Sequence, residues 1–522
     1  MNPSFDLAVV GSGFSGSLMA LVGRRLGRSV VLVERGSHPR FAIGESSSPL
    51  ANLLLEGLAD RYDLPRVRPL AAWGSWRRTY PDVLCGLKRG FTFYGHEAAR
   101  PFAAAADRSD QLLVAASPND EVADTHWYRP DFDAFLANEA AASGAEFMDR
   151  TELTVVSRDA AGFELAAERL GARTTFRARF VIDASGPGGF LHRSLGLPES
   201  AFPDLPATEG LYAHFDGVER LGTMGSVPSA DLPPYPADDA ALHHVFDGGW
   251  IWVLRFASGL VSAGVAATPE LARELRLSEG APAWDRLLAR FPTVRGQFAR
   301  ARPATAFVHR RRLPFRSGAG GGPGWALLPS AAAFVDPLLS TGFPLTLLGI
   351  ERLAAAIETS WGDPPAFDRR LREYQDQTLF EADTAALLVS ALYASFHDFP
   401  VFAALTLLYF AAASYAEAAR RLGRPELAGS FLSGSHPTFG PALTRCCRMA
   451  LERDPRGRDA LLAAIRGAIE PLDVIGLSDA SRRNWFPVDA ADLFAGAHKL
   501  GASRGEIEEM LCRAGMAPVR VS

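Results

Sequence analysis

The 522-residue chain is poor in cysteine, has no large excess of charge of one sign and shows no internal repeat of fixed period. Four cysteines (Cys85, Cys446, Cys447 and Cys512), none in a CxxC pair, are too few for a disulfide scaffold. A net charge of −5 gives no basis for binding nucleic acid. The first residues lack the basic segment that opens a secretory signal. Together these absences favour a cytoplasmic protein.

One apolar stretch, residues 400–416, raises the question of a membrane. It holds about 17 residues without a charge, the lower limit for crossing a bilayer. Nearly half of them are Ala, Ser or Thr, which contribute little hydrophobic transfer energy. We therefore expect a buried helix that could line a substrate cavity, with peripheral membrane contact as the alternative.

The order of the patterns along the chain predicts an α/β fold. Short β-branched runs at 7–10 and 30–33 predict buried strands, and the helical pattern of 15–28 between them completes a β-α-β unit. Stretches punctuated by Pro and Gly, rich in aromatic residues, predict an antiparallel sheet. After about residue 345 the chain is rich in Ala, Leu and Arg with helical spacing.

The turn from Gly11 to Gly16 has the pattern GxGxxG and lies directly between the first strand and the helix. Gly11 makes the tight turn, Gly13 lets the backbone approach a pyrophosphate, and Gly16 lets the helix pack against the sheet. The helix N-terminus favours an anion. Glu34 follows Gly16 by 18 residues, where a carboxylate can accept ribose hydroxyls. These features predict a dinucleotide site but do not separate FAD from NAD.

Five further segments resemble those of flavin-dependent halogenases and occur in that family's order. The first resembles the flavin-contacting segment, the second the lysine strand, the third an Arg-containing helix start, the fourth a tryptophan-pair strand and the fifth the flavin and halide loop. They are HPRFAIGESSSP (38–49), CGLKRGFTFYGH (85–96), THWYRPDFDAFLANEA (125–140), HHVFDGGWIWVLRF (243–256) and AAAFVDPLLSTGF (331–343). Within the family, the segments are most similar to the branch that halogenates small free phenols, the phloroglucinol-type enzymes.

This resemblance implies a fold and a cofactor. The fold is a p-hydroxybenzoate hydroxylase-type, Rossmann-like FAD module in residues 1–365, interleaved with a substrate sheet mainly over 85–125 and 205–315. A C-terminal helical region, 366–522, would cover the substrate pocket. The cofactor would be FAD, used as FADH2 with oxygen and with chloride or bromide to make hypohalous acid.

The resemblance also implies roles for individual residues. Hypohalous acid would travel to Lys88, whose amine can form a haloamine or polarise the oxidant, and burial would favour its neutral form. The halide would bind at Ser340, Thr341 and Gly342, and Trp250 and Trp252 would separate flavin from substrate. The FAD contacts would be Gly11, Gly13, Phe14, Ser15, Gly16, Glu34, Arg35, Gly44, Glu45, Ser46, Arg129, Asp183 and Asp336. For Arg129, an ion pair within the protein is an equally good interpretation.

Three positions depart from relatives. Arg255 replaces the proline of the family's W-x-W-x-I-P pattern, and Pro329-Ser330 replaces a common Gly-Asp. Leu339 stands where the tryptophan-acting branch has a glutamate thought to steady a cationic indole intermediate. A phenol stabilises its own intermediate through the ring oxygen, so Leu339 favours a phenolic substrate.

Two other function classes stay open. Arg255 and the missing Gly-Asp favour a flavin hydroxylase or dehydrogenase of the same fold without halide chemistry. The stretch 400–416 is the support for a flavin-loaded binding or membrane-associated protein. We expect no metal, since His243 and His244 lack partners at ligand spacing. The expected partners are a separate NAD(P)H-dependent flavin reductase and a small aromatic substrate, free or tethered to a carrier.

Overall fold

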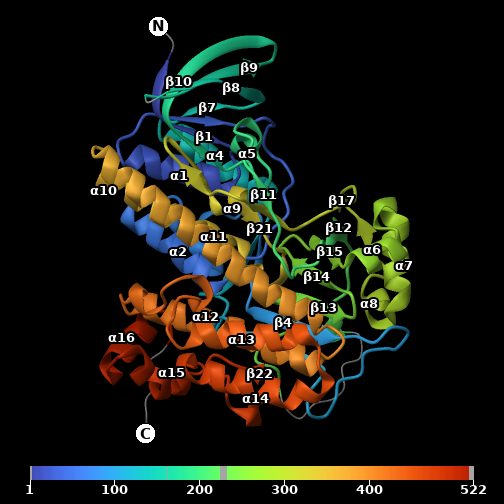
Figure 1. The fold of residues 1–522 in the computed structure, drawn as a ribbon. Helices are drawn as coiled ribbons and strands as arrows, with labels where there is room; N and C mark the ends of the chain where they lie inside the picture. The colour runs from blue at the N-terminus through green and yellow to red at the C-terminus, as the bar shows by residue number, and fades with distance from the viewer. Residues whose placement is uncertain (1–2, 160, 224–231, 517–522) are drawn as a thin grey trace.

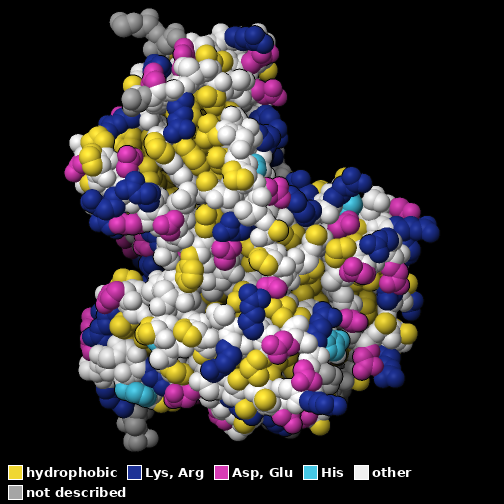
Figure 2. Space-filling view, in the orientation of Figure 1, with side chains coloured by type: hydrophobic (Ala, Val, Ile, Leu, Met, Phe, Trp, Pro, Cys, Tyr) yellow, Lys and Arg dark blue, Asp and Glu magenta, His cyan; other side chains and the backbone are white. Residues whose placement is uncertain are grey.

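The computed structural model describes residues 3–159, 161–223 and 232–516. The fold is α/β, with a Rossmann-like module, a second mixed sheet and a C-terminal helical region (Figure 1). The module lies at one end of the molecule, the second sheet with its small helices forms a side lobe, and the last helices form the opposite end. The outline in Figure 2 is concave between the module and the side lobe.

The module is built on a sheet whose central strands are parallel. In the described residues its order is β19-β20-β10-β1-β2-β7, with β8 and β9 continuing from β10. Every residue of β2 and the last four of β1 are buried, because helices cover both faces of a parallel sheet. The strands are β1 (Ser4–Val10), β2 (Val30–Val33), β7 (Glu146–Met148), β8 (Thr151–Asp159), β9 (Gly162–Arg169), β10 (Ala172–Asp183), β19 (Gly321–Gly322) and β20 (Trp325–Leu327).

The second sheet carries the tryptophan pair. Its order over the described residues is β16-β12-β15-β14-β13-β4-β5-β22, with β17 beside β12. Most neighbours are antiparallel, whereas β13–β4 and β5–β22 are parallel. The strands are β4 (Gly90–Gly95), β5 (Gln111–Ala115), β12 (Glu209–Asp216), β13 (Ala241–Phe246), β14 (Gly249–Arg255), β15 (Val261–Ala267), β16 (Arg302–Pro303), β17 (Val308–Arg310) and β22 (Trp485–Phe486).

Two small sheets connect these units. The first pairs β3 (Cys85–Lys88) with β6 (Asp124–Trp127), and the second has the order β11-β18-β21, from β11 (Glu199–Ser200), β18 (Phe315–Ser317) and β21 (Ala333–Phe334). The helices up to the C-terminal region are α1 (Phe14–Arg25), α2 (Pro49–Arg61), α3 (Trp73–Thr79), α4 (Arg129–Ala142), α5 (Phe190–Ser194), α6 (Pro269–Leu275), α7 (Ala281–Arg290), α8 (Pro292–Gln297), α9 (Pro329–Ala332) and α10 (Gly342–Ser360).

The C-terminal region consists mainly of α11 (Pro364–Ala394), α12 (Phe399–Arg421), α13 (Phe439–Glu452), α14 (Arg458–Ile469), α15 (Ala490–Gly496) and α16 (Arg504–Arg513). Asp363 and Asp398 cap the first two of these helices by accepting backbone N–H bonds, and each helix has a proline in its first turn. The region is not helical throughout, because β22 pairs with β5 and extends the second sheet.

Helix α12 contains the apolar stretch singled out in the sequence. By length and composition it could cross a bilayer, yet its aromatic residues pack on β4: Phe402 contacts Phe93, and Phe410 contacts Phe91, with ring centroids 5.6 and 5.2 Å apart. The helix is largely buried inside the protein, as the core-helix interpretation predicts.

Candidate active site

A cavity of about 1160 Å³ runs between the module and the second sheet. Its walls bring together segments that are distant in sequence, including the Gly-rich turn, the end of β2, residues 40–46, the turn after β10, strand β14 and the loop before α10. Of the residues expected in the site, all line this cavity except Gly16, Lys88 and Asp183.

The Gly-rich turn has the geometry that a dinucleotide needs. Gly11 has a φ of +98°, and a Cβ there would lie 2.7 Å from the Ala184 carbonyl oxygen. A Cβ on Gly16 would lie 1.8 Å from the Gly11 carbonyl oxygen, so Gly16 serves helix packing rather than ligand contact. A Cβ on Gly13 would meet only side-chain atoms at 3.5 Å or more and would instead protrude at the cavity wall.

Glu34 directly follows β2 and binds the backbone of the Gly-rich turn. Its carboxylate accepts hydrogen bonds from the backbone N–H groups of Ser12 (3.0 Å) and Gly36 (2.9 Å), and Arg40 approaches it at 3.2 Å. Burial opposes ionisation, but Arg40 and these N–H groups outweigh it and lower the pKa of Glu34. An ionised carboxylate at the end of β2 is suited to accept ribose hydroxyls. Arg35, beside it, is exposed at the cavity wall.

Arg129 at the start of α4 binds the backbone of residues 43–44, in the segment between β2 and α2. It forms a two-point ion pair with Asp133 (2.8 and 2.7 Å) and donates to the carbonyl oxygens of Ile43 (3.2 Å) and Gly44 (3.0 Å). The ion pair left open by the sequence is therefore present. Its guanidinium lines the cavity, but its hydrogen bonds within the protein hold the flavin-contacting segment in place.

Asp183 acts behind the second Gly-rich turn. Its carboxylate accepts hydrogen bonds from the N–H and hydroxyl of Ser185 and from the N–H of Leu191 (2.8, 2.6 and 2.6 Å). The cavity is lined not by Asp183 but by the turn it holds, residues 184–190. Glycine-lined turns, a helix N-terminus, an ionised glutamate and several arginines together form a donor set that fits FAD.

The loop before α10 has an unusual backbone. Leu339 and Ser340 both lie in the left-handed region, with φ of +64° and +55°, a conformation that costs on the order of 1–3 kcal/mol per non-glycine residue. It places Ser340, Thr341 and Gly342 on the cavity wall at the N-terminus of α10. Among the residues that the structure describes, no side chain caps that helix, so its first N–H groups and its dipole are available to an anion.

The tryptophan pair lies on β14 and is anchored from the C-terminal region. Trp250 and Trp252 face one side, with ring centroids 5.6 Å apart, and both line the cavity. The Trp250 indole donates to the Tyr393 hydroxyl (3.1 Å), which donates to Asp336 (3.0 Å). Burial raises the pKa of Asp336 to about 6, against the effect of its hydrogen-bond donors. This chain joins β14, α11 and the loop before α10.

Lys88 ends β3 with none of its surface exposed to solvent. Its Nζ donates to the Ser46 hydroxyl (2.9 Å) and to the Ser47 carbonyl oxygen, and lies 3.6 Å from the centroid of the Phe91 ring. Burial lowers the pKa of Lys88 to about 7, although Asp124 opposes this effect. Burial therefore favours the neutral amine, which a nucleophile or hydrogen-bond acceptor requires.

A second cavity, of about 140 Å³, is lined in part by Phe91, whose ring faces the Lys88 amine. It is mostly apolar and is lined by Phe91, by Tyr409, Phe410 and Ala413 of α12, and by the pair Glu417–Arg421 (2.9 Å). Ser46 lines the first cavity and Phe91 lines the second, so the Lys88 amine contacts one residue of each.

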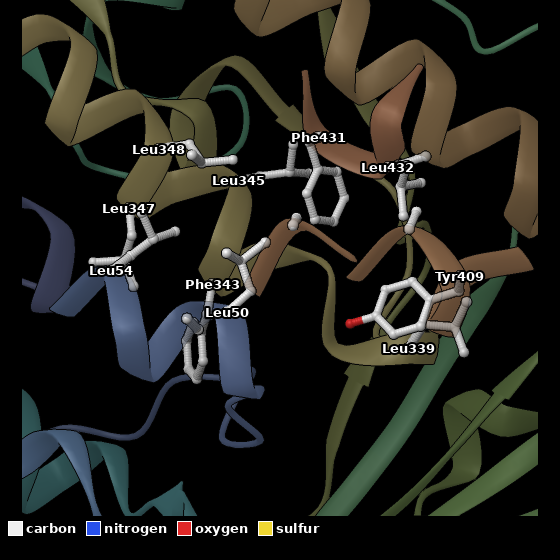
Figure 3. Close-up of a cluster of buried hydrophobic side chains, with 14 of the residues drawn as sticks. Leu50, Leu54, Leu339, Phe343, Leu345, Leu347, Leu348, Tyr409, Phe431 and Leu432 are labelled. Carbon is white, nitrogen blue, oxygen red and sulfur yellow. The ribbon is translucent and has the colours of Figure 1, made fainter. Parts of the chain in front are cut away.

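Buried apolar side chains from several elements pack together beside these cavities. Figure 3 shows Leu50 and Leu54 of α2, Phe343 of α10, Tyr409 of α12 and Leu432 in one buried cluster with Leu339. Leu339 is fully buried and lines neither cavity.

The other departures from relatives also have defined places. The Arg255 guanidinium binds Asp238 and the carbonyl oxygens of Val218 and Glu219, outside the cavity lining. Ser330 does line the cavity, with its hydroxyl 3.3 Å from that of Ser15.

Sequence reasoning missed several residues of the site. Arg40 and Asp124 lie inside or beside the quoted segments and could have been found there, but Tyr393 and Tyr409 come from helices without a motif. Glu45 also has an unforeseen partner, since its carboxylate lies 3.0 Å from Nε2 of the buried His214.

His243 and His244, which the sequence raised as metal ligands, instead contact other side chains of the protein. His243 stacks on Phe93 at 4.3 Å, whereas His244 bonds to His96 and Gln297, each at 2.9 Å. Among the described residues, no group of three or more His, Cys, Asp or Glu side chains is placed to hold a metal.

Comparison with known proteins identifies the family. The family of FAD dependent oxidoreductases matches residues 6–333. The chain is 31% identical over 417 residues to monodechloroaminopyrrolnitrin halogenase PrnC of Pseudomonas fluorescens, covering 78% of this chain and 70% of that protein. It is 28% identical to tetracycline 7-halogenase of Kitasatospora aureofaciens, covering 66% of this chain and 61% of that protein. The crystal structure of halogenase PltM in complex with phloroglucinol and FAD is similar, with a TM-score of 0.82, 25% identity and coverage of 92% of this chain and 99% of that one. The chain therefore belongs to the FAD-dependent oxidoreductases and, within them, to the flavin-dependent halogenases.

Proposed function

We propose that this flavin-dependent halogenase uses O2 and chloride or bromide to halogenate a phenolic or similarly electron-rich aromatic, through hypohalous acid that reaches Lys88. One observation carries the proposal. The amine of Lys88 is excluded from solvent, contacts Ser46 of the larger cavity and faces Phe91 of the smaller one. The amine is thus one residue away from the cavity in which the oxidant would form, and it is shielded from bulk water.

The larger cavity supports the first half of the reaction. When bound there, reduced FAD supplies two electrons, so that FADH2, O2, a halide ion and a proton give FAD, hypohalous acid and water. The halide would lie against the N–H groups at the start of α10, beside Ser340 and Thr341. Trp250 and Trp252 form part of the wall and would keep the aromatic substrate away from the flavin.

Lys88 supports the second half. A neutral amine can take the halogen from hypohalous acid, releasing water and forming a haloamine, or it can hold the acid by a hydrogen bond. In either case the ring gains the halogen and loses a proton, and the amine is regenerated. Burial in the Ser46–Phe91 environment favours the neutral form that the haloamine route needs.

The smaller cavity supports a compact aromatic substrate. A cavity of about 150 Å³ accommodates benzene, and this one has a similar volume with one polar end at Glu417 and Arg421. Halogenase PltM is known in complex with phloroglucinol, a small phenol.

Mass spectrometry of a reconstituted reaction tests the proposal. The protein, FAD, NADH, a separate flavin reductase and chloride or bromide are incubated with a panel of phenols, offered free and as carrier-protein thioesters. We expect product with the isotope pattern of the added halide. Oxygenated product that persists without halide would indicate a hydroxylase. Vesicle co-sedimentation without any product would indicate a binding protein.

A further inference from the structure

Lys88 has a buried acidic neighbour that the halogenation scheme above does not use. Strands β3 and β6 pair antiparallel, and Asp124 lies directly opposite Lys88 in their register. Asp124 is only 4% exposed. Residues directly opposite on adjacent strands project from the same face of the sheet, so the two side chains share one environment.

The carboxylate of Asp124 is only partly satisfied by the protein. Asn52 of α2 donates to its Oδ1 at 3.2 Å, whereas its buried Oδ2 has no hydrogen-bond partner within the part of the chain that the structure describes. An isolated buried carboxylate is costly, and a cation nearby lowers this cost. Burial raises the pKa of Asp124, and Lys88 opposes that rise. The converse holds for Lys88, because burial lowers its pKa and Asp124 opposes that fall.

We propose that Asp124 is a positioning residue, a buried acid whose ionisation is coupled to that of Lys88 and which thereby sets the pH range in which Lys88 works. This inference rests on the proposed function only for its consequence in turnover. The pair can hold one shared proton in two ways. Either Lys88 is an ammonium and Asp124 a carboxylate, or Lys88 is a neutral amine and Asp124 a carboxylic acid.

Other titratable groups surround Lys88 and Asp124, but none of those named below takes over the effect of Asp124 on Lys88. His126 of β6 and His243 of β13 are buried, and burial, followed by smaller effects that include Lys88, lowers their pKa values. They therefore add no positive charge near neutral pH. On α12, Glu417 and Arg421 act on Asp124 in opposite directions and pair with each other. Tyr409 of α12 stays protonated because burial raises its pKa.

The composition of the chain makes the test direct. Lys88 and Lys499 are its only lysines, and Lys499 lies in the C-terminal region, where it bonds to Glu470. In a Lys499→Arg background, isotope-labelled lysine gives one side-chain NMR signal, that of Lys88. Its chemical shift against pH reports the protonation of Lys88 without any turnover.

The experiment compares Asp124→Asn with the unaltered residue in the Lys499→Arg protein carrying FAD. We expect the titration midpoint of Lys88 to fall by about one pH unit or more, a tenfold or larger loss of proton affinity. Glu417→Gln, which removes a carboxylate that is paired with Arg421, should move the midpoint less. An unchanged midpoint in Asp124→Asn, or an equal shift in Glu417→Gln, would overturn the proposal.

A second variant, Asn52→Leu, tests the proposal if Asp124→Asn does not fold. Asn52→Leu keeps the carboxylate but removes its hydrogen-bond donor, so Asp124 holds its proton more tightly and the Lys88 midpoint should fall by a smaller amount. No shift would again overturn the proposal. The pH profile of halogenation is measured in parallel: if the midpoint moves but the profile does not, Asp124 controls Lys88 while the proposed role of Lys88 in turnover is wrong.

Discussion

The two cavities whose walls Lys88 contacts through Ser46 and Phe91 are built in different ways. Glycine turns, a helix N-terminus and arginines from contiguous motifs form much of the larger one, whereas apolar side chains from several separate elements form most of the smaller one. The larger cavity needs particular backbone geometry at a few positions. The smaller one needs only side chains of suitable shape. A cofactor site can therefore stay recognisable while the substrate pocket beside it changes.

Replacement of Lys88 should have the largest effect, because it should suppress halogenation while leaving FAD binding in the larger cavity intact. We expect Lys88→Ala to reduce halogenated product by about 10²–10⁴-fold, the usual range for removing an acid–base group, while FAD affinity is unchanged. Product is measured by mass spectrometry and FAD binding by fluorescence. Lys499→Arg is the control and should behave as the unaltered enzyme. Normal halogenation by Lys88→Ala would refute the relay.

Asp336 joins the larger cavity to the C-terminal region through Tyr393, and its protonation should affect stability. Its pKa is raised to about 6 in the folded protein, so the folded state holds a proton that the unfolded state releases at lower pH. The resulting stabilisation is complete below the unfolded pKa and is lost as the pH rises through about 6. Relative to Asp336→Asn, the enzyme should lose on the order of 3 kcal/mol across this range.

Thermal unfolding of the apoproteins at several pH values measures this difference. A constant gap in Tm between Asp336→Asn and the unaltered protein from acid to neutral pH would contradict the expected link between the two regions.

Gly13→Ala should affect only the larger cavity. Its φ of −64° suits any residue and the new Cβ meets no backbone atom within 3.5 Å, so the apoprotein should keep its Tm. The methyl group would protrude toward the pyrophosphate site and raise the Kd for FAD about tenfold or more, or about 1.4 kcal/mol. Gly16→Ala is the contrasting variant, since its Cβ would strike the Gly11 carbonyl oxygen and lower the Tm itself.

Ala413→Phe should affect only the smaller cavity. Ala413 lies on its wall, and a ring there would occupy space needed by the substrate. We expect KM for the best phenol to rise about tenfold, or about 1.4 kcal/mol, with FAD affinity unchanged. Steady-state kinetics and flavin titration check both statements. An unchanged KM would mean that the substrate binds elsewhere.

The difference between the two cavities also explains which parts of the site the sequence could predict. The strands at 7–10 and 30–33, the helix between them and the order of the family segments follow from local patterns, and the structure contains them as β1, β2, α1 and the cavity walls. The Tyr393 contact with Trp250 and the placement of Tyr409 beside the smaller cavity depend on how α11 and α12 pack across the sheet. No local spacing encodes such contacts, because many combinations of apolar and aromatic residues satisfy the same packing.

The pairing of β22 with β5 means that the enzyme cannot be divided at residue 366 into an independent flavoprotein and a removable cover. Truncation there would leave β5 as an open sheet edge and strip Phe91 and Phe93 of the α12 rings that shield them. The helix that would line the proposed substrate pocket thus also covers apolar residues of β4, so a change of single side chains would alter the pocket while leaving that cover in place.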